Sequence, residues 1–191
     1  MKTLSFIAAM AVGMNLVLWS SSVDMPLGKC YAPFKPDQKI VKQEKTNAKY
    51  LDVVVSQYDV SAMMVKDVIQ LANKYQKKTF PKTEDILALI GIESSWNPNA
   101  KSPLKVDPAI GLTQIRPVAW KKLISHPSEL LHIENQIKYA SDILHYNFRL
   151  TKSKDDAIIA YNVGYGNWLD GKYDLSYFTK FVSERDKFRR G

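Results

Sequence analysis

A helical spacing of apolar residues, which begins at Ser61 and continues toward the C-terminus, constrains the fold of this chain most. Residues three and four positions apart share one face of an α-helix, whereas a strand alternates faces every second residue. The first such face carries Val65, Val68, Ile69 and Ala72. A longer one carries Ile133, Ile137, Ala140, Leu144 and Phe148. We therefore predict a mainly α fold.

Capping residues predict the ends of further helices. Thr83 can cap a helix whose first turn is acidic, and Pro117 can open a helix over residues 117–125. Ser153, with an aspartate three positions later, forms a capping box before a helix that Gly164 can end. A last amphipathic helix is expected over about residues 175–189.

The composition of the N-terminus is typical of an export signal. Lys2 precedes an uncharged apolar run over residues 4–19, which as a helix would span about 24 Å, short of the roughly 30 Å of a bilayer core. Residues 1–22 are therefore predicted to be a signal peptide, with a retained membrane anchor as the alternative. Either reading predicts an exported protein of the periplasm or cell envelope, or one associated with a virion.

The remainder is expected to form an extension and one domain. Residues 31–50 mix proline, lysine and glutamine with few apolar residues and are typical of an exposed linker, while 51–60 fit either a short strand or the docked start of the domain. The predicted organisation is a linker over 23–60 and a helical domain over 61–191. A single cysteine excludes an internal disulfide.

Glu93 interrupts an apolar helix face. It follows Ile86, Leu89 and Ile90 at helical spacing, so its carboxyl group is expected at the edge of the core. Desolvation favours the protonated form, and a neutral carboxylic acid near pH 7 can protonate a glycosidic oxygen. The spacing alone fits equally a glutamate paired with a basic residue, or one at a frayed helix end facing water.

Three motifs extend this interpretation. They read ESSWNPNAKSP over 93–103, AIGLTQIRP over 109–117 and AYNVGYGN over 160–167. Together and in this order they resemble the SLT-type lytic transglycosylases, whose catalytic domain has a lysozyme-like helical fold. The resemblance covers roughly residues 61–180.

The resemblance implies an enzyme that acts on peptidoglycan glycan strands. This family cuts the β-1,4 bond between N-acetylmuramic acid and N-acetylglucosamine and leaves 1,6-anhydro ends. The sequence itself shows no ligand set for a metal and no phosphate-binding loop, so no cofactor is expected. Glu93 matches the family's single catalytic acid/base. Ser102 and Gln114 match residues that contact saccharide, Tyr161 matches a tyrosine whose hydroxyl orients the acid, and Asn162 belongs to the same motif.

The sequence departs from the family pattern between the first two motifs. Residues 102–111 are about three longer than usual, and Arg116 stands where methionine is frequent, which favours an anionic peptide carboxylate. Asp107 lies in the lengthened loop. A related goose-type lysozyme uses an aspartate in the corresponding loop to activate water, so a hydrolytic muramidase using Glu93 and Asp107 is the first alternative.

A non-catalytic cell-wall adaptor of a secretion, conjugation or phage-entry machine is the second alternative. Such a machine is also the kind of partner that would recruit a small enzyme, and residues 1–22 would add membrane association. The net charge of +8 fits attraction to anionic wall polymers. No nucleic-acid-binding motif is present, and the three histidines lack companion ligands for a metal.

Overall fold

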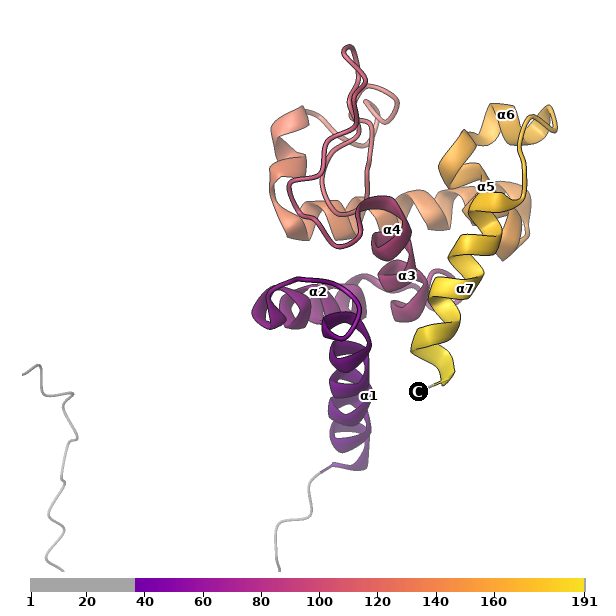
Figure 1. Ribbon diagram of the computed structural model, residues 1–191. Coiled ribbons are helices and arrows are strands. Elements are labelled where there is room, and N and C mark those ends of the chain that lie inside the picture. The colour runs from indigo at the N-terminus through magenta and orange to yellow at the C-terminus, as the bar shows by residue number, and fades with distance from the viewer. Residues whose placement is uncertain (1–36, 191) are drawn as a thin grey trace, which may run out of the picture. The chain divides into compact units, whose positions relative to one another are not determined.

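The computed structural model describes residues 37–190, which form seven α-helices and one short 3₁₀ helix (Figure 1). The elements are α1 (Gln38–Val55), α2 (Ala62–Tyr75), α3 (Thr83–Ser94), η1 (Pro127–Leu131), α4 (Ile133–Thr151), α5 (Lys154–Val163), α6 (Tyr165–Leu169) and α7 (Ser176–Arg190). These residues contain no β-strand, so the predicted mainly α fold is confirmed. None of their helices is both long and apolar enough to cross a membrane.

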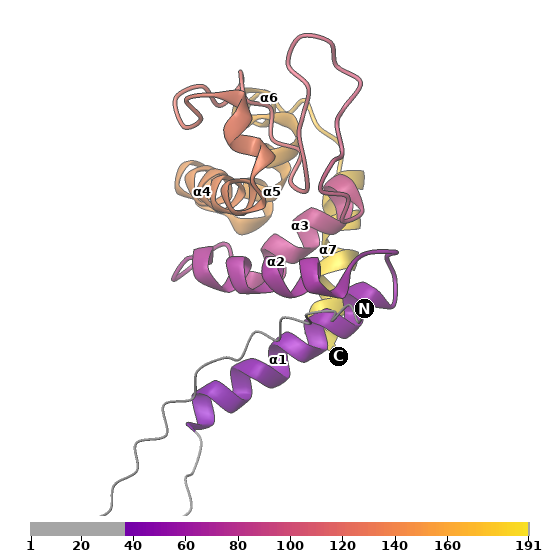
Figure 2. The same ribbon diagram turned by 90° about the vertical axis from the view of Figure 1, so that its left-hand side faces the viewer.

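Helix α3 is the centre of the packing. It contacts α2, α4 and α7, and both views show it among these helices (Figures 1 and 2). Its middle residues, Ile86 to Ile90, are fully buried in succession, because a helix that is apolar nearly all round is covered on every side. The last turn of α3 carries Glu93, so the most enclosed helix delivers this carboxyl group.

Several predicted helix faces and ends agree with the structure. In α4, Ile137, Ala140 and Leu144 are fully buried, as their spacing predicts. At the start of α5, the Ser153 Oγ accepts a hydrogen bond of 3.2 Å from the backbone N–H of Asp156. The helix then ends at Gly164, whose φ of 83° is left-handed.

The expected linker is in part a helix. Residues 38–55 form α1, which packs on α2 and α7 with Tyr50 and Val54 in the core. The first half of α1 is largely exposed, and lysine, glutamine and glutamate are common both in linkers and on the open faces of helices, so composition did not separate the two. The predicted signal or anchor over 1–22 lies outside the described residues.

Residues 117–125, where a helix was expected, do not form one. This segment forms consecutive turns, with irregular hydrogen bonds such as that from the Leu123 N–H to the Trp120 carbonyl (2.8 Å). The Asp107 carboxylate accepts hydrogen bonds from the N–H groups of Val118 and Ala119. Proline at the first position is compatible with the start of a helix, but the Asp107 side chain holds the backbone N–H groups of Val118 and Ala119 in a turn.

A buried glutamine holds the loop that follows α3. The Gln136 Oε1 accepts a hydrogen bond of 2.7 Å from the Leu112 N–H, and its Nε2 donates one of 2.7 Å to the Leu130 carbonyl. Gly111 packs so closely that a Cβ there would lie 2.3 Å from the glutamine amide, and its φ of 74° also requires glycine. The loop and α4 are therefore joined through one amide group.

Replacing Gln136 with methionine should destabilise the fold. The change keeps the side chain's length but leaves two buried backbone groups without partners, at about 1–3 kcal/mol each. Urea unfolding should show this loss in the free energy of unfolding. Gln70→Met, at an exposed position of α2, is the matched control and should change stability little. Equal stability of the two variants would contradict a structural role for the Gln136 amide.

Candidate active site

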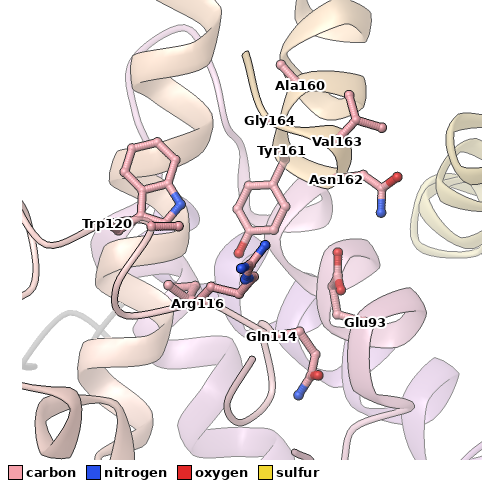
Figure 3. A pocket seen from close by; sticks show the side chains of 11 residues that line it. Glu93, Gln114, Arg116, Trp120, Ala160, Tyr161, Asn162, Val163 and Gly164 are labelled. Atoms are coloured by element: carbon pink, nitrogen blue, oxygen red, sulfur yellow. The ribbon is translucent and has the colours of Figure 1, made fainter. Parts of the chain in front are cut away.

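An open pocket lies where α3, the loop after it and α5 meet. Its volume is about 160 Å³. Its lining residues are Glu93, Gln114, Ile115, Arg116, Ala119, Trp120, Ala160, Tyr161, Asn162, Val163 and Gly164. Figure 3 shows Glu93 on one side of this pocket and Trp120 on the other, with Tyr161 between them.

The pocket changes the pKa of Glu93. It lies one position before the end of α3, beyond the buried Ile86 and Ile90. Burial raises its pKa to about 7, and a hydrogen bond from Tyr177 acts in the opposite direction. At neutral pH the carboxyl group therefore exists in both protonation states, which is what a proton donor that must later accept a proton requires.

Tyr177, at the start of α7, is the one direct hydrogen-bond partner of Glu93 within the described chain. Its hydroxyl donates to the Glu93 Oε1 at 2.5 Å. Helix α7 lies close to α3 because Gly91 has no side chain: a Cβ there would lie 2.9 Å from the Glu184 Cγ. Sequence reasoning missed Tyr177, since periodicity assigns it to a helix but says nothing about which helix it crosses.

Tyr161 lines the pocket but does not hydrogen-bond to Glu93. Its hydroxyl donates instead to the Thr113 carbonyl at 2.8 Å, which ties α5 to the loop. Burial, with the Glu93 charge nearby, raises the pKa of Tyr161 well above its ordinary value, so the hydroxyl stays neutral. The expected direct orientation of the acid by Tyr161 is thus made by Tyr177 in this structure. Asn162 lies next to Tyr161, at the exposed rim (Figure 3).

Gln114 and Ser102 both brace the loop. The Gln114 Nε2 donates to the carbonyls of Ala100 (3.1 Å) and Gly111 (2.9 Å), and its left-handed φ of 49° turns the chain at the pocket. The Ser102 Oγ accepts a hydrogen bond of 2.8 Å from the Ala109 N–H and lies outside the pocket lining. Of the four predicted substrate-binding residues, the structure brings Gln114, Tyr161 and Asn162 together with Glu93, and not Ser102.

Asp107 does not line the pocket, and its carboxylate is occupied. The Oδ1 accepts from the Val118 N–H at 2.9 Å and the Oδ2 from the Ala119 N–H at 3.2 Å. The Oδ2 also lies 3.1 Å from the Arg116 Nε. Only 7% of this side chain is exposed, so it acts as a buried anchor for the turns after Arg116. No group of three metal-ligating side chains gathers in residues 37–190.

The fold and pocket define a helical domain that presents one carboxylic acid to a pocket lined by amide, hydroxyl and aromatic side chains. The family model described as Transglycosylase SLT domain matches residues 70–178, more than half of the chain. The chain therefore belongs to this family.

Comparisons with individual proteins add little detail. The crystal structure of the 70 kDa soluble lytic transglycosylase Slt70 from Escherichia coli matches with 23% identity and a TM-score of 0.45. The match covers 76% of this chain and 27% of that one, so the chain spans about a quarter of the length of Slt70. No curated protein matches.

Glu93→Gln should change how stability depends on pH. Burial raises the pKa of Glu93 in the folded state above its ordinary value of 4.5. The preference of the folded state for the neutral carboxyl group therefore contributes to stability in full below pH 4.5. This contribution is lost as pH rises through about 7. Glutamine cannot ionise, so the variant should match wild type in acid and be the more stable protein above neutrality. Thermal unfolding from acid to alkaline pH measures the difference in stability between the variant and wild type, with the exposed Glu44→Gln as control. A difference in stability that does not vary with pH would show that Glu93 is not desolvated.

Tyr177→Phe should shift the pH–rate profile of the domain's reaction. The hydrogen bond from Tyr177 lowers the pKa of Glu93, so its loss should raise that pKa and move the alkaline limb of kcat/KM upward. Tyr161→Phe removes a hydroxyl that serves Thr113 and should change the rate without moving the limb. An alkaline limb that stays in place in Tyr177→Phe would contradict the assignment of this hydrogen bond.

Proposed function

We propose that this protein is a peptidoglycan lytic transglycosylase with Glu93 as its single acid/base. It would cleave the β-1,4 bond between N-acetylmuramic acid and N-acetylglucosamine and form 1,6-anhydro ends. The observation that carries the proposal is that Glu93, with a pKa of about 7, is the one carboxyl group among the residues that line the pocket. Membership of the transglycosylase SLT domain family supports the same reaction class.

The reaction uses one proton twice. Neutral Glu93 donates its proton to the glycosidic oxygen, the bond from that oxygen to the muramic C1 breaks, and the N-acetylglucosamine end leaves. The substrate's own N-acetyl group stabilises the cationic C1. The Glu93 carboxylate then removes the proton of the muramic C6 hydroxyl, whose oxygen bonds to C1. Glu93 is protonated again and no water is consumed.

The remaining rate enhancement comes from positioning. General acid–base catalysis contributes typically about 10²–10⁴ in rate, so orientation and distortion of the sugar must supply the rest. In the proposal Gln114 offers its amide oxygen to the sugar, because its two N–H groups hold the loop, and Asn162 offers its amide group from the rim of the pocket. Tyr161 holds the loop against α5. Ser102 serves from the base of the loop, where its Oγ holds Ala109.

The test is mass spectrometry of the sugars that the purified full-length protein releases from purified sacculi. We expect products with anhydro ends, lighter by one water than reducing ends. Glu93→Gln should bind sacculi but release product at least about 10²-fold more slowly. Thermal unfolding of the variant at neutral pH verifies that it is folded.

Each alternative gives a different result. Reducing ends would establish hydrolysis and would require a base that the structure does not supply at Asp107, since both oxygens of that carboxylate are engaged. Binding to sacculi without any product from wild type would identify an adaptor. Product from Glu93→Gln at the wild-type rate would refute the assignment of the acid.

The proposal includes an exported protein that works in the periplasm or cell envelope. Residues 1–22 would serve as a signal peptide or a membrane anchor, and the net charge of +8 would favour contact with anionic wall polymers. A secretion, conjugation or phage-entry machine is the partner class for which local opening of the wall is useful.

A further inference from the structure

Arg116 is the one cationic residue among those that line the pocket. Its side chain is 53% exposed, and in the view of Figure 3 its guanidinium lies between Trp120 and Glu93. A half-exposed arginine at the mouth of a pocket can meet a ligand without displacing protein groups. Its surroundings decide whether the charge is available.

One edge of the guanidinium is fixed by Asp107. The Arg116 Nε lies 3.1 Å from the Asp107 Oδ2 and also donates to the Asp107 carbonyl at 3.3 Å. Within residues 37–190 its terminal nitrogens, Nη1 and Nη2, make no hydrogen bond or ion pair. An arginine held through Nε presents its other nitrogens as a pre-oriented fork, the geometry that binds a carboxylate with two hydrogen bonds.

Asp107 does not neutralise the Arg116 charge completely. Its carboxylate accepts hydrogen bonds from two backbone N–H groups, those of Val118 and Ala119, so the buried anion is stabilised by these donors as well as by the ion pair with Arg116. The pocket itself holds no competing anion when Glu93 is protonated, and burial keeps much of Glu93 in that form at neutral pH. The pocket therefore has one unmatched cationic fork.

We infer that Arg116 forms a subsite for a carboxylate of the peptidoglycan strand, with Asp107 as its positioning residue. The inference rests on the proposed function, since it names a further group on the same substrate. Two sources share this chemistry: the carboxylates of the stem peptide, and the lactyl carboxylate that muramic acid bears once its peptide is removed. The lengthened loop over 102–111 supplies the aspartate that makes the subsite rigid.

The subsite can be tested without turnover by measuring, with calorimetry, how tightly the Glu93→Gln protein binds soluble glycan strands. Three preparations are compared: strands with peptides, strands stripped by an amidase, and strands whose carboxylates have been converted to amides. With Arg116 in place, the protein should bind carboxylate-bearing strands about tenfold more tightly than amidated ones. This ratio is at the low end for hydrogen bonds to charged groups, because the guanidinium is half exposed. Weaker binding of stripped strands than of strands with peptides would identify the stem peptide as the source.

Arg116→Gln should reduce this preference well below that of Arg190→Gln, which has the same net charge. Arg116→Lys keeps the charge but not the fork and should recover part of it. Arg190→Gln is the matched control, because it removes an arginine that pairs with an aspartate (Asp186, 3.4 Å) away from the pocket, and it should keep the full preference. Thermal unfolding of each variant verifies the fold.

Two failures are distinguishable. If Arg116→Gln weakens binding of amidated and intact strands equally, or if the parent protein shows no preference for carboxylates, the inference is overturned and the proposed function stands. If the protein binds no strand and wild type releases no sugar from sacculi, the proposed function fails.

Discussion

The cost of ionising a carboxyl group that is partly removed from water is the constraint on which the rest of this site depends. Glu93 holds a proton near pH 7 because it lies at the end of a helix whose middle is covered on all sides, and its one side-chain hydrogen-bond partner within residues 37–190 is a neutral hydroxyl. A cation in direct contact with Glu93 would oppose the effect by stabilising the charged form. Arg116 lies at the mouth of the same pocket but pairs with Asp107, and it is not among the causes of the shift in the pKa of Glu93.

The pocket exists because separate parts of the chain are joined by single polar contacts. Gln136 joins the loop to α4, the Tyr161 hydroxyl joins it to α5, and the Ser94 hydroxyl joins it to α3 through the Leu112 carbonyl at 2.9 Å. Each contact satisfies a backbone group that irregular structure would otherwise leave without a partner. Several of the polar residues around the active site therefore build the loop, and fewer of them face the substrate than the motifs alone indicate.

Local order was predictable from the sequence, and contacts between distant elements were not. The buried face of α4, the cap of α5 and the position of Glu93 all follow from helical spacing, which acts over a few residues. Gln136 also carries a usable signal, since it lies on the inward face three positions after Ile133. Tyr177 has no such signal, because its role depends on how closely α7 approaches α3. The turns after Pro117 depend likewise on Asp107, ten residues earlier.

The occupied state of Asp107 links the proposed reaction to the proposed specificity. Attack by water from the far face of the sugar needs a second base there, about 6.5–9.5 Å from the acid. A carboxylate that accepts two backbone hydrogen bonds and pairs with Arg116 is a poor candidate for that base. The remaining base is Glu93 itself, on the side of the leaving oxygen, and the muramic C6 hydroxyl is the nucleophile within the substrate that it would serve. In this arrangement the aspartate orients an arginine toward a carboxylate rather than activating water, so the same loop would favour the internal reaction and select the strand that undergoes it.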